Sequence, residues 1–444
     1  MSATSQACGR MRRLALAVLL AAALAAPALH AALAAPLPKA TPESAGMSQA
    51  RLAKIGTAMR EAIARQDFQG VVVMVARRGR LVYSEALGAL KPDAPMRDDA
   101  IFRLYSMTKP LVSVAAMLLV EDGTIQLTDP VSKYLPGFDA MDVIAEDKGA
   151  MGAAKSKTVP AERPMTVQDL LRHTSGLAYA EIAKNPELKE AYRLAGVYRP
   201  DVPFDARQAA PRDEVAGMAK TPLVFQPGTT WNYGMSTDML GRVIEAASGQ
   251  RLGEFMQARL LGPVGMTDTG FFVPAAQLGR LAEPLPKDRT SGQPNTLIDV
   301  SAIPQNDSGG AGGVSTASDY LRFCQMLLNG GAIDGTRVLS RTTVRLMTSD
   351  HLGPYIARPA EPGELLLGVK GYTFGLGFAV RQEDGLAAVP GTEGEFTWGG
   401  YAGTYFWVDP EEELTAVMMS QAPGPLRAHY RRMLRQMVYQ AIVD

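Results

Sequence analysis

A serine and a lysine three residues apart form the chain's one S-x-x-K tetrad, Ser106-Met107-Thr108-Lys109. On a helix, residues at this spacing share a face, so the lysine nitrogen can reach the serine oxygen. A serine hydroxyl is a weak nucleophile and needs a partner that takes its proton. A lysine can take it when burial or a nearby cation favours the neutral amine. By itself the tetrad also fits a serine N-cap followed by a surface lysine.

The flanking residues favour a buried helix at this place. Apolar Leu111, Val114 and Leu118 recur at helical spacing, and Asp122-Gly123 ends the pattern, which predicts a helix over 107–121. Pro110 is tolerated so close to a helix start. Free N–H groups and a partial positive charge at the helix start are suited to stabilising an oxyanion.

Four more stretches resemble catalytic motifs of one family. They are Asp169–Leu177, Trp231–Ser236, Gly309–Thr316 and Trp398–Thr404. With the tetrad, their order and spacing resemble those of the serine β-lactamase and penicillin-binding-protein-like hydrolases, over roughly residues 42–440. Within this group the chain is most similar to the family VIII carboxylesterases, which are relatives of class C β-lactamases.

The resemblance assigns roles to individual residues. It implies that Ser106 is the acylated nucleophile, Lys109 its base and Tyr233 a tyrosine that moves protons between nucleophile and leaving group. It places Trp398-Gly399-Gly400 on an edge strand beside the substrate, where glycines allow close approach of the backbone. The backbone N–H groups of Ser106 and Tyr401 are then the expected oxyanion donors.

Two departures from the β-lactamase pattern bear on the substrate. Met235 stands where β-lactamases carry an asparagine, and Trp398 stands where they carry a lysine. The asparagine and lysine help to bind the amide and carboxylate of a β-lactam, whereas apolar residues suit an uncharged acyl group. We therefore expect an ester hydrolase for short acyl chains. The alternatives are a β-lactamase, a D-amino-acid-specific peptidase acting on cell-wall peptides, and a sensor that is acylated once without turnover.

Two other motifs invite different interpretations. His173 could belong to a Ser-His-Asp triad, but the tetrad already supplies a base, and no G-x-S-x-G elbow is present to favour an α/β-hydrolase. Gly309 to Gly313 could suggest phosphate binding, but no Lys-Ser/Thr pair follows, so we interpret it as a flexible loop.

The order of predicted elements defines the fold class. A helix is expected over 48–65, strands at 71–75 and 81–83, mostly helices and long loops from 106 to 330, strands again between 374 and 420, and a last helix over 427–443. The stretches 142–163, 179–221 and 352–370 are expected to be loops. An α+β chain follows, with an antiparallel sheet built from both ends, as the β-lactamase-like (DD-peptidase) fold requires. Its α/β lobe would span about 42–100 and 370–444, and its helical lobe about 101–369.

Composition excludes several classes of function. Lys plus Arg and Asp plus Glu each number 45, so no excess of positive charge is available for nucleic-acid phosphates. Two cysteines and four histidines without close ligand spacing argue against a metal site. We expect no cofactor, and the expected partner is a small-molecule ester or β-lactam-like substrate. The sequence does not indicate an oligomeric state.

Residues 1–34 resemble an export signal. Arg10, Arg12 and Arg13 precede an apolar run over 14–26, and Ala32-Leu33-Ala34 supplies a small-x-small cleavage pattern. The apolar run is too short to cross a bilayer. An uncleaved anchor is the alternative. We expect a periplasmic or secreted bacterial protein, with no membrane span after cleavage.

Overall fold

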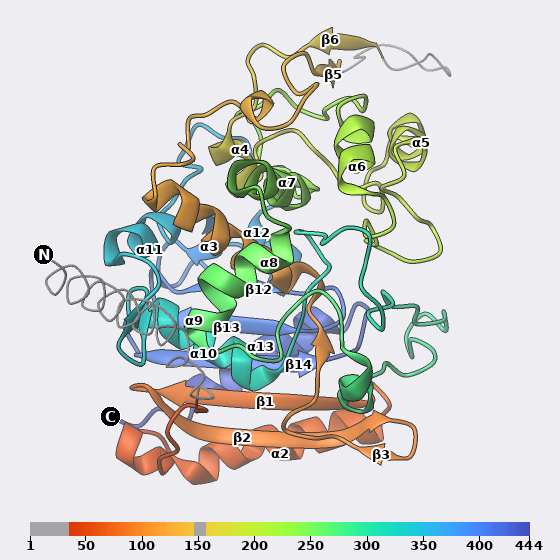
Figure 1. Cartoon of the computed structure of the whole chain (residues 1–444). Coiled ribbons are helices and arrows are strands. Elements are labelled where there is room, and N and C mark those ends of the chain that lie inside the picture. Colours follow the sequence, from red (N-terminus) through yellow and green to blue (C-terminus); the bar gives the residue numbers. More distant parts are fainter. Residues whose placement is uncertain (1–34, 146–156) are drawn as a thin grey trace, which may run out of the picture. The chain divides into compact units, whose positions relative to one another are not determined.

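The computed structural model describes residues 35–145 and 157–444, and the predicted signal segment 1–34 lies outside the described residues. An eight-stranded antiparallel sheet has the strand order β10-β11-β12-β13-β14-β1-β2-β3 (Figure 1). Its strands are β1 (Gly70–Arg77), β2 (Arg80–Lys91), β3 (Ala94–Pro95), β10 (Tyr372–Phe374), β11 (Ala379–Arg381), β12 (Phe396–Gly399), β13 (Tyr405–Asp409) and β14 (Leu414–Ser420). Strands from the two ends of the chain therefore form one sheet.

The two groups of strands meet where β1 pairs with β14. Their register runs from Val71 opposite Ser420 to Arg77 opposite Leu414. All eight residues of β1 are buried, which explains its run of β-branched residues without polar alternation. The predicted α+β class and antiparallel sheet are confirmed.

Helices pack on the sheet and also form the part of the chain between its two groups of strands. Against the sheet, α2 contacts β2, and α10 contacts β1, β13 and β14. The helices are α2 (Gln49–Ala64), α3 (Thr108–Glu121), α4 (Val167–Leu171), α5 (Pro186–Leu194), α6 (Pro211–Met218), α7 (Ser236–Ser248), α8 (Leu252–Met256), α9 (Gly262–Val264), α10 (Ala317–Leu328), α11 (Arg341–Met347), α12 (Pro362–Leu367) and α13 (Arg427–Tyr439). In the middle of the chain, α3 packs against α7, and this pair carries the candidate site.

Short elements complete the described chain. Short 3-10 helices are η1 (Pro42–Ala45), η2 (Tyr105–Met107), η3 (Val131–Lys133) and η5 (Ala275–Arg280), and η4 (Gln257–Leu261) is π-helical. Three two-stranded pairs join β4 (Phe102–Arg103) to β7 (Val314–Ser315), β5 (Asp142–Ile144) to β6 (Thr158–Pro160), and β8 (Ala332–Ile333) to β9 (Thr336–Arg337). No helix among the described residues is long and apolar enough to cross a membrane.

The long stretches expected to be loops contain regular structure. The stretch 142–163 holds the β5–β6 pair, 179–221 holds α5 and α6, and 352–370 holds α12. These elements are short, and α5, α6 and α12 each begin with proline at their first or second position, which fixes the backbone dihedral that a helix start needs. Part of 142–163, residues 146–156, lies outside the described residues.

Candidate active site

Ser106 lies in a tight turn that leads directly into a buried helix. It is the second residue of η2, and α3 begins two residues later at Thr108. Tyr105, just before it, has φ +48°, a left-handed conformation that is rare for a bulky residue. The Tyr105 hydroxyl accepts a hydrogen bond from the Ile298 N–H at 2.9 Å. The turn therefore holds the serine in one position at the start of the helix.

Lys109 lies one turn further on and is almost completely buried. Its Nζ lies 2.7 Å from the Gly310 carbonyl oxygen, 2.9 Å from the Tyr179 hydroxyl and 3.4 Å from Ser106 Oγ. An ammonium group has three N–H donors and no acceptor. Three acceptors thus match its three protons, and Ser106 is the most distant of them.

Tyr233 approaches Ser106 from a remote part of the chain, just before α7. Its phenolic oxygen lies 2.6 Å from Ser106 Oγ, and Lys109 Nζ lies 4.8 Å from the centre of its ring. The phenol is therefore closer to the serine oxygen than the lysine is. The structure brings together the three side chains that the sequence singled out for catalysis.

Tyr179 and Asp238 complete the surroundings of the lysine, and the sequence did not single them out. The Tyr179 hydroxyl donates to Asp238 Oδ2 at 3.2 Å while it accepts from Lys109. Burial, reinforced by the charge of Asp238, raises the pKa of Tyr179 well above its usual value, so this phenol stays protonated. Lys109, Tyr179 and Asp238 form a hydrogen-bonded chain, which we call the lysine relay.

The glycine-rich stretch 309–313 is buried, so its interpretation as a flexible loop was wrong. Asp238 Oδ1 accepts hydrogen bonds from Ser308 Oγ at 2.6 Å and from the Gly310 N–H at 3.0 Å. A methyl group on Gly310 would lie only 2.6 Å from the Tyr179 hydroxyl oxygen. Glycine is required here for close packing, which places the Gly310 carbonyl against Lys109.

The stretch Trp398-Gly399-Gly400 ends β12 and begins the turn into β13. The expectation of an edge strand was wrong, because β12 lies between β11 and β13. However, β11 pairs only with Phe396 and Thr397, so β12 has no partner on that side from Trp398 onward. Trp398 and Gly399 therefore pair only with β13, although β12 as a whole is an internal strand.

Two backbone N–H groups are available to bind an oxyanion. Ser106 is the second residue of its helical turn, where an N–H has no acceptor within the helix. The N–H of Tyr401 donates to no acceptor among residues 35–145 and 157–444. Thr404 Oγ1 donates to the Leu104 carbonyl oxygen at 3.1 Å, which ties the two turns together.

The two residues that replace the β-lactamase asparagine and lysine are both buried. Met235 lies just before α7 and is 1% exposed, as part of the main hydrophobic core. Trp398 is also 1% exposed, and its ring packs against Tyr233 and Phe374 with centroids 5.4 and 5.2 Å apart. Trp398 therefore supplies apolar bulk beside Tyr233, and Met235 belongs to the core.

His173 does not form a triad with Ser106. Burial, and then the charge of Lys109, lowers its pKa well below the usual value, so the ring is neutral. Its Nε2 lies 3.5 Å from Thr237 Oγ1, and its Nδ1 has no hydrogen-bond partner in the described chain. Without a carboxylate partner, the ring serves as packing for Tyr233, at 5.0 Å between centroids.

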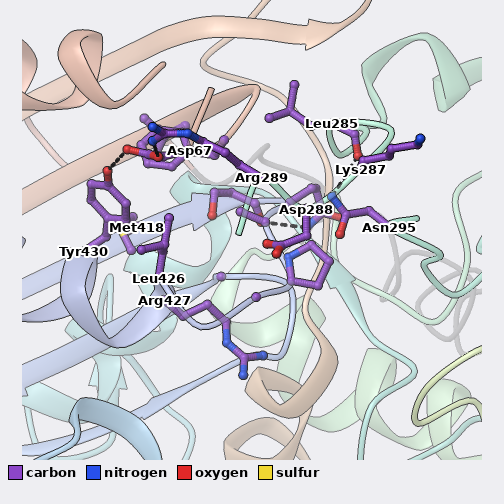
Figure 2. Close-up of a pocket in the computed structure, with 18 residues that line it drawn as sticks. Asp67, Leu285, Lys287, Asp288, Arg289, Asn295, Met418, Leu426, Arg427 and Tyr430 are labelled. Carbon is purple, nitrogen blue, oxygen red and sulfur yellow. Dashed lines mark hydrogen bonds and ion pairs between the residues drawn. The ribbon is translucent and has the colours of Figure 1, made fainter. Parts of the chain in front are cut away.

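One pocket is not lined by any of the three side chains that the sequence singled out. Figure 2 shows its lining, which includes Arg427 but none of Ser106, Lys109 and Tyr233. Arg427 donates to the Tyr401 carbonyl oxygen, and its guanidinium lies 4.9 Å from the centre of the Tyr401 ring. The arginine therefore holds the Tyr401–Ala402 peptide, which is next to the peptide that carries one expected oxyanion donor.

Comparisons with known proteins identify the family of this chain. The β-lactamase family model matches residues 55–439. Protein Rv1367c of Mycobacterium tuberculosis is 35% identical over 79% of this chain and 85% of its own length. Esterase EstB of Burkholderia gladioli is 28% identical over 84% of this chain and 92% of its own length.

Solved structures give the same result. The structure of EstCE1, described as a hydrolase with promiscuous acyltransferase activity, superposes with a TM-score of 0.70 at 26% identity, over 88% of this chain and 99% of that one. The family match spans both groups of sheet strands and the helices between them. The chain therefore belongs to the β-lactamase family, as a serine hydrolase similar to its esterases.

Proposed function

We propose that this protein hydrolyses carboxylic esters with short acyl chains through an acyl-enzyme on Ser106. The observation that carries the proposal is the 2.6 Å contact between the Tyr233 phenolic oxygen and Ser106 Oγ, next to a lysine with three acceptors. A nucleophile with an adjacent proton acceptor, itself next to a fixed charge, is the arrangement that covalent catalysis needs.

The reaction proceeds in two steps that use only groups of this chain. In the reacting form Tyr233 is a phenolate: its oxygen, the nearest acceptor, takes the Ser106 proton, while the Lys109 ammonium supplies the counter-charge. Oγ attacks the ester carbonyl, and the Ser106 and Tyr401 N–H groups bind the resulting oxyanion. Tyr233 then returns the proton to the leaving alcohol oxygen, and water repeats the sequence to release the acid.

The proton acceptor in this scheme differs from the one expected from the sequence. Lys109 was expected to be the base, but its short contacts are with Gly310 and Tyr179, and Ser106 lies beyond both. An ammonium group can donate to all three acceptors around Lys109 Nζ. We therefore assign proton transfer to Tyr233 and charge stabilisation to Lys109.

An uncharged acyl group fits the residues behind the site. The positions that are asparagine and lysine in β-lactamases are buried Met235 and Trp398, which offer no positive charge for a β-lactam carboxylate. The relatives named as esterases support the same choice. Export to the periplasm or medium is proposed from the sequence of residues 1–34 alone, and N-terminal sequencing of the secreted protein tests it.

The function is tested with 4-nitrophenyl acetate and butyrate beside nitrocefin. We expect ester turnover that is lost in Ser106→Ala, with an unchanged circular dichroism spectrum, and little turnover of nitrocefin. A single burst without turnover would indicate the acylated sensor. Nitrocefin turnover far above that of the esters would indicate a β-lactamase, and ester turnover retained in Ser106→Ala would refute the assignment.

A further inference from the structure

Phe204 joins the aromatic side chains of the site into a continuous wall. Its ring centroid lies 5.2 Å from that of Tyr179 and 5.1 Å from that of Tyr401. Tyr401 contacts Tyr105 at 5.3 Å, and Tyr179 contacts Tyr233 at 5.6 Å. Phe204 is thus the link between the residue beside the lysine and the residue that carries an oxyanion donor.

The backbone of Phe204 is held in an unfavourable conformation. Its φ is +62°, in the left-handed region that bulky residues avoid. Its N–H donates to Glu181 Oε1 at 2.8 Å. Burial raises the pKa of Glu181, so this carboxyl is itself held in a poorly solvated place. Strain that the surroundings maintain is found mainly at functional sites.

The residues after Phe204 anchor it firmly. Asp205 is buried, accepts from Arg199 Nη1 at 3.4 Å, and accepts the Arg207 N–H at 3.1 Å. The buried Arg207 donates to the carbonyl oxygens of Asp299 and Phe271. Phe204, in contrast, is only partly buried, and it packs against both the main core and the smaller cluster around Tyr105. Asp205 and Arg207 therefore hold the backbone next to Phe204 in place, and the Phe204 ring itself remains partly exposed.

The position of the ring relates it to one side of the substrate. Tyr233 must face the leaving oxygen to protonate it, so the alcohol part of the ester lies toward Tyr233. Phe204 contacts Tyr179 and Tyr401, and no ring contact joins it to Tyr233 within the described chain. With the alcohol part toward Tyr233, the acyl part, which extends from the carbonyl away from the leaving oxygen, would run toward Phe204.

We propose that Phe204 is the specificity-determining residue that limits the length of the acyl chain. This inference rests on the proposed esterase function and names the feature that restricts it to short acyl groups. The ring occupies the space between Tyr179 and Tyr401 that a longer chain would need. Replacing it with a small side chain extends the acyl site without touching Ser106, Lys109 or Tyr233.

The test compares Phe204→Ala and Phe204→Leu with the wild type on 4-nitrophenyl acetate, butyrate and octanoate. A second series keeps an acetyl group and lengthens the alcohol from ethyl to octyl, with released acetate measured. Tyr198→Ala is the matched control, because Tyr198 is a partly buried aromatic residue of the same segment with no ring contact to the site within the described chain.

We expect the ratio of kcat/KM for octanoate to that for acetate to rise at least tenfold in Phe204→Ala, less in Phe204→Leu, and not in Tyr198→Ala. The alcohol series should keep its wild-type profile. An unchanged acyl profile, or a change confined to the alcohol series, would overturn the inference while ester turnover by the wild type still stood. Absence of Ser106-dependent ester turnover in the wild type would instead defeat the proposed function.

Discussion

Tyr179→Phe is the substitution that most specifically probes the lysine relay. It removes one oxygen and leaves the ring, with its contacts to Tyr233 and Phe204, in place. That oxygen accepts from Lys109 Nζ at 2.9 Å and donates to Asp238 Oδ2 at 3.2 Å. The variant therefore leaves the ammonium with two acceptors and frees it to move relative to Ser106.

The size of the effect follows from the partners of this oxygen. Both hydrogen bonds involve a charged group, and such a bond contributes about 1.5–3 kcal/mol. If the contribution of one such hydrogen bond to stabilising the transition state is lost, kcat falls by roughly 10- to 150-fold, at about 1.4 kcal/mol for each factor of ten. KM should change little, because the acyl and alcohol groups do not bind this hydroxyl.

The assay is steady-state hydrolysis of 4-nitrophenyl butyrate, with unfolding in urea measured on the same samples. Tyr372→Phe is the control, since Tyr372 is also buried, donates to the carboxylate of Glu395 and lies in β10. We expect both variants to lose stability and only Tyr179→Phe to lose kcat. Wild-type kcat in Tyr179→Phe would show that the relay is structural and would refute the reasoning.

Three further results are expected. Gly310→Ala should reduce kcat at least tenfold, because its methyl group cannot fit beside Asp238; wild-type activity would contradict this packing. Burial acts to raise the pKa of Asp169, but hydrogen bonds from Arg163 and its neighbours lower it to about 2, so its contribution to stability is present above pH 4 and is lost as the pH falls toward 2. Urea unfolding at several pH values should show this loss, and Asp169→Asn should flatten it. Phe204→Gly should have a thermal midpoint at least as high as Phe204→Ala, because glycine adopts the left-handed conformation without strain; a much lower midpoint would show that the backbone is not strained there.

Local patterns predicted the parts of the site that are close in sequence. Ser106 and Lys109 were found from their spacing, because one helical turn brings them together whatever the rest of the chain does. The helices α2 and α3 were predicted within one residue at either end, since a serine cap marks the start of α2 and Asp122-Gly123 follows the end of α3.

The parts assembled from distant segments were not accessible in this way. Tyr233 was reached through family resemblance, and Tyr179 and Asp238 were missed because no spacing relates them to Lys109. The glycines at 309–313 were misjudged because their composition is that of a mobile loop. Only the structure shows that they are needed for close contact with Asp238 and Thr237. The internal position of β12 depends on its pairing with short β11, which in turn pairs with short β10.

The central claim is that Ser106 forms a covalent acyl-enzyme with Tyr233 as its proton partner. The most direct test is rapid acid quench after mixing with 4-nitrophenyl butyrate, followed by peptide mass spectrometry of the wild type, Ser106→Ala and Tyr233→Phe. The account predicts one butyryl group on the peptide containing Ser106 in the wild type, none in Ser106→Ala, and much slower acylation in Tyr233→Phe. A butyryl group on another residue, or wild-type acylation in Tyr233→Phe, would contradict it.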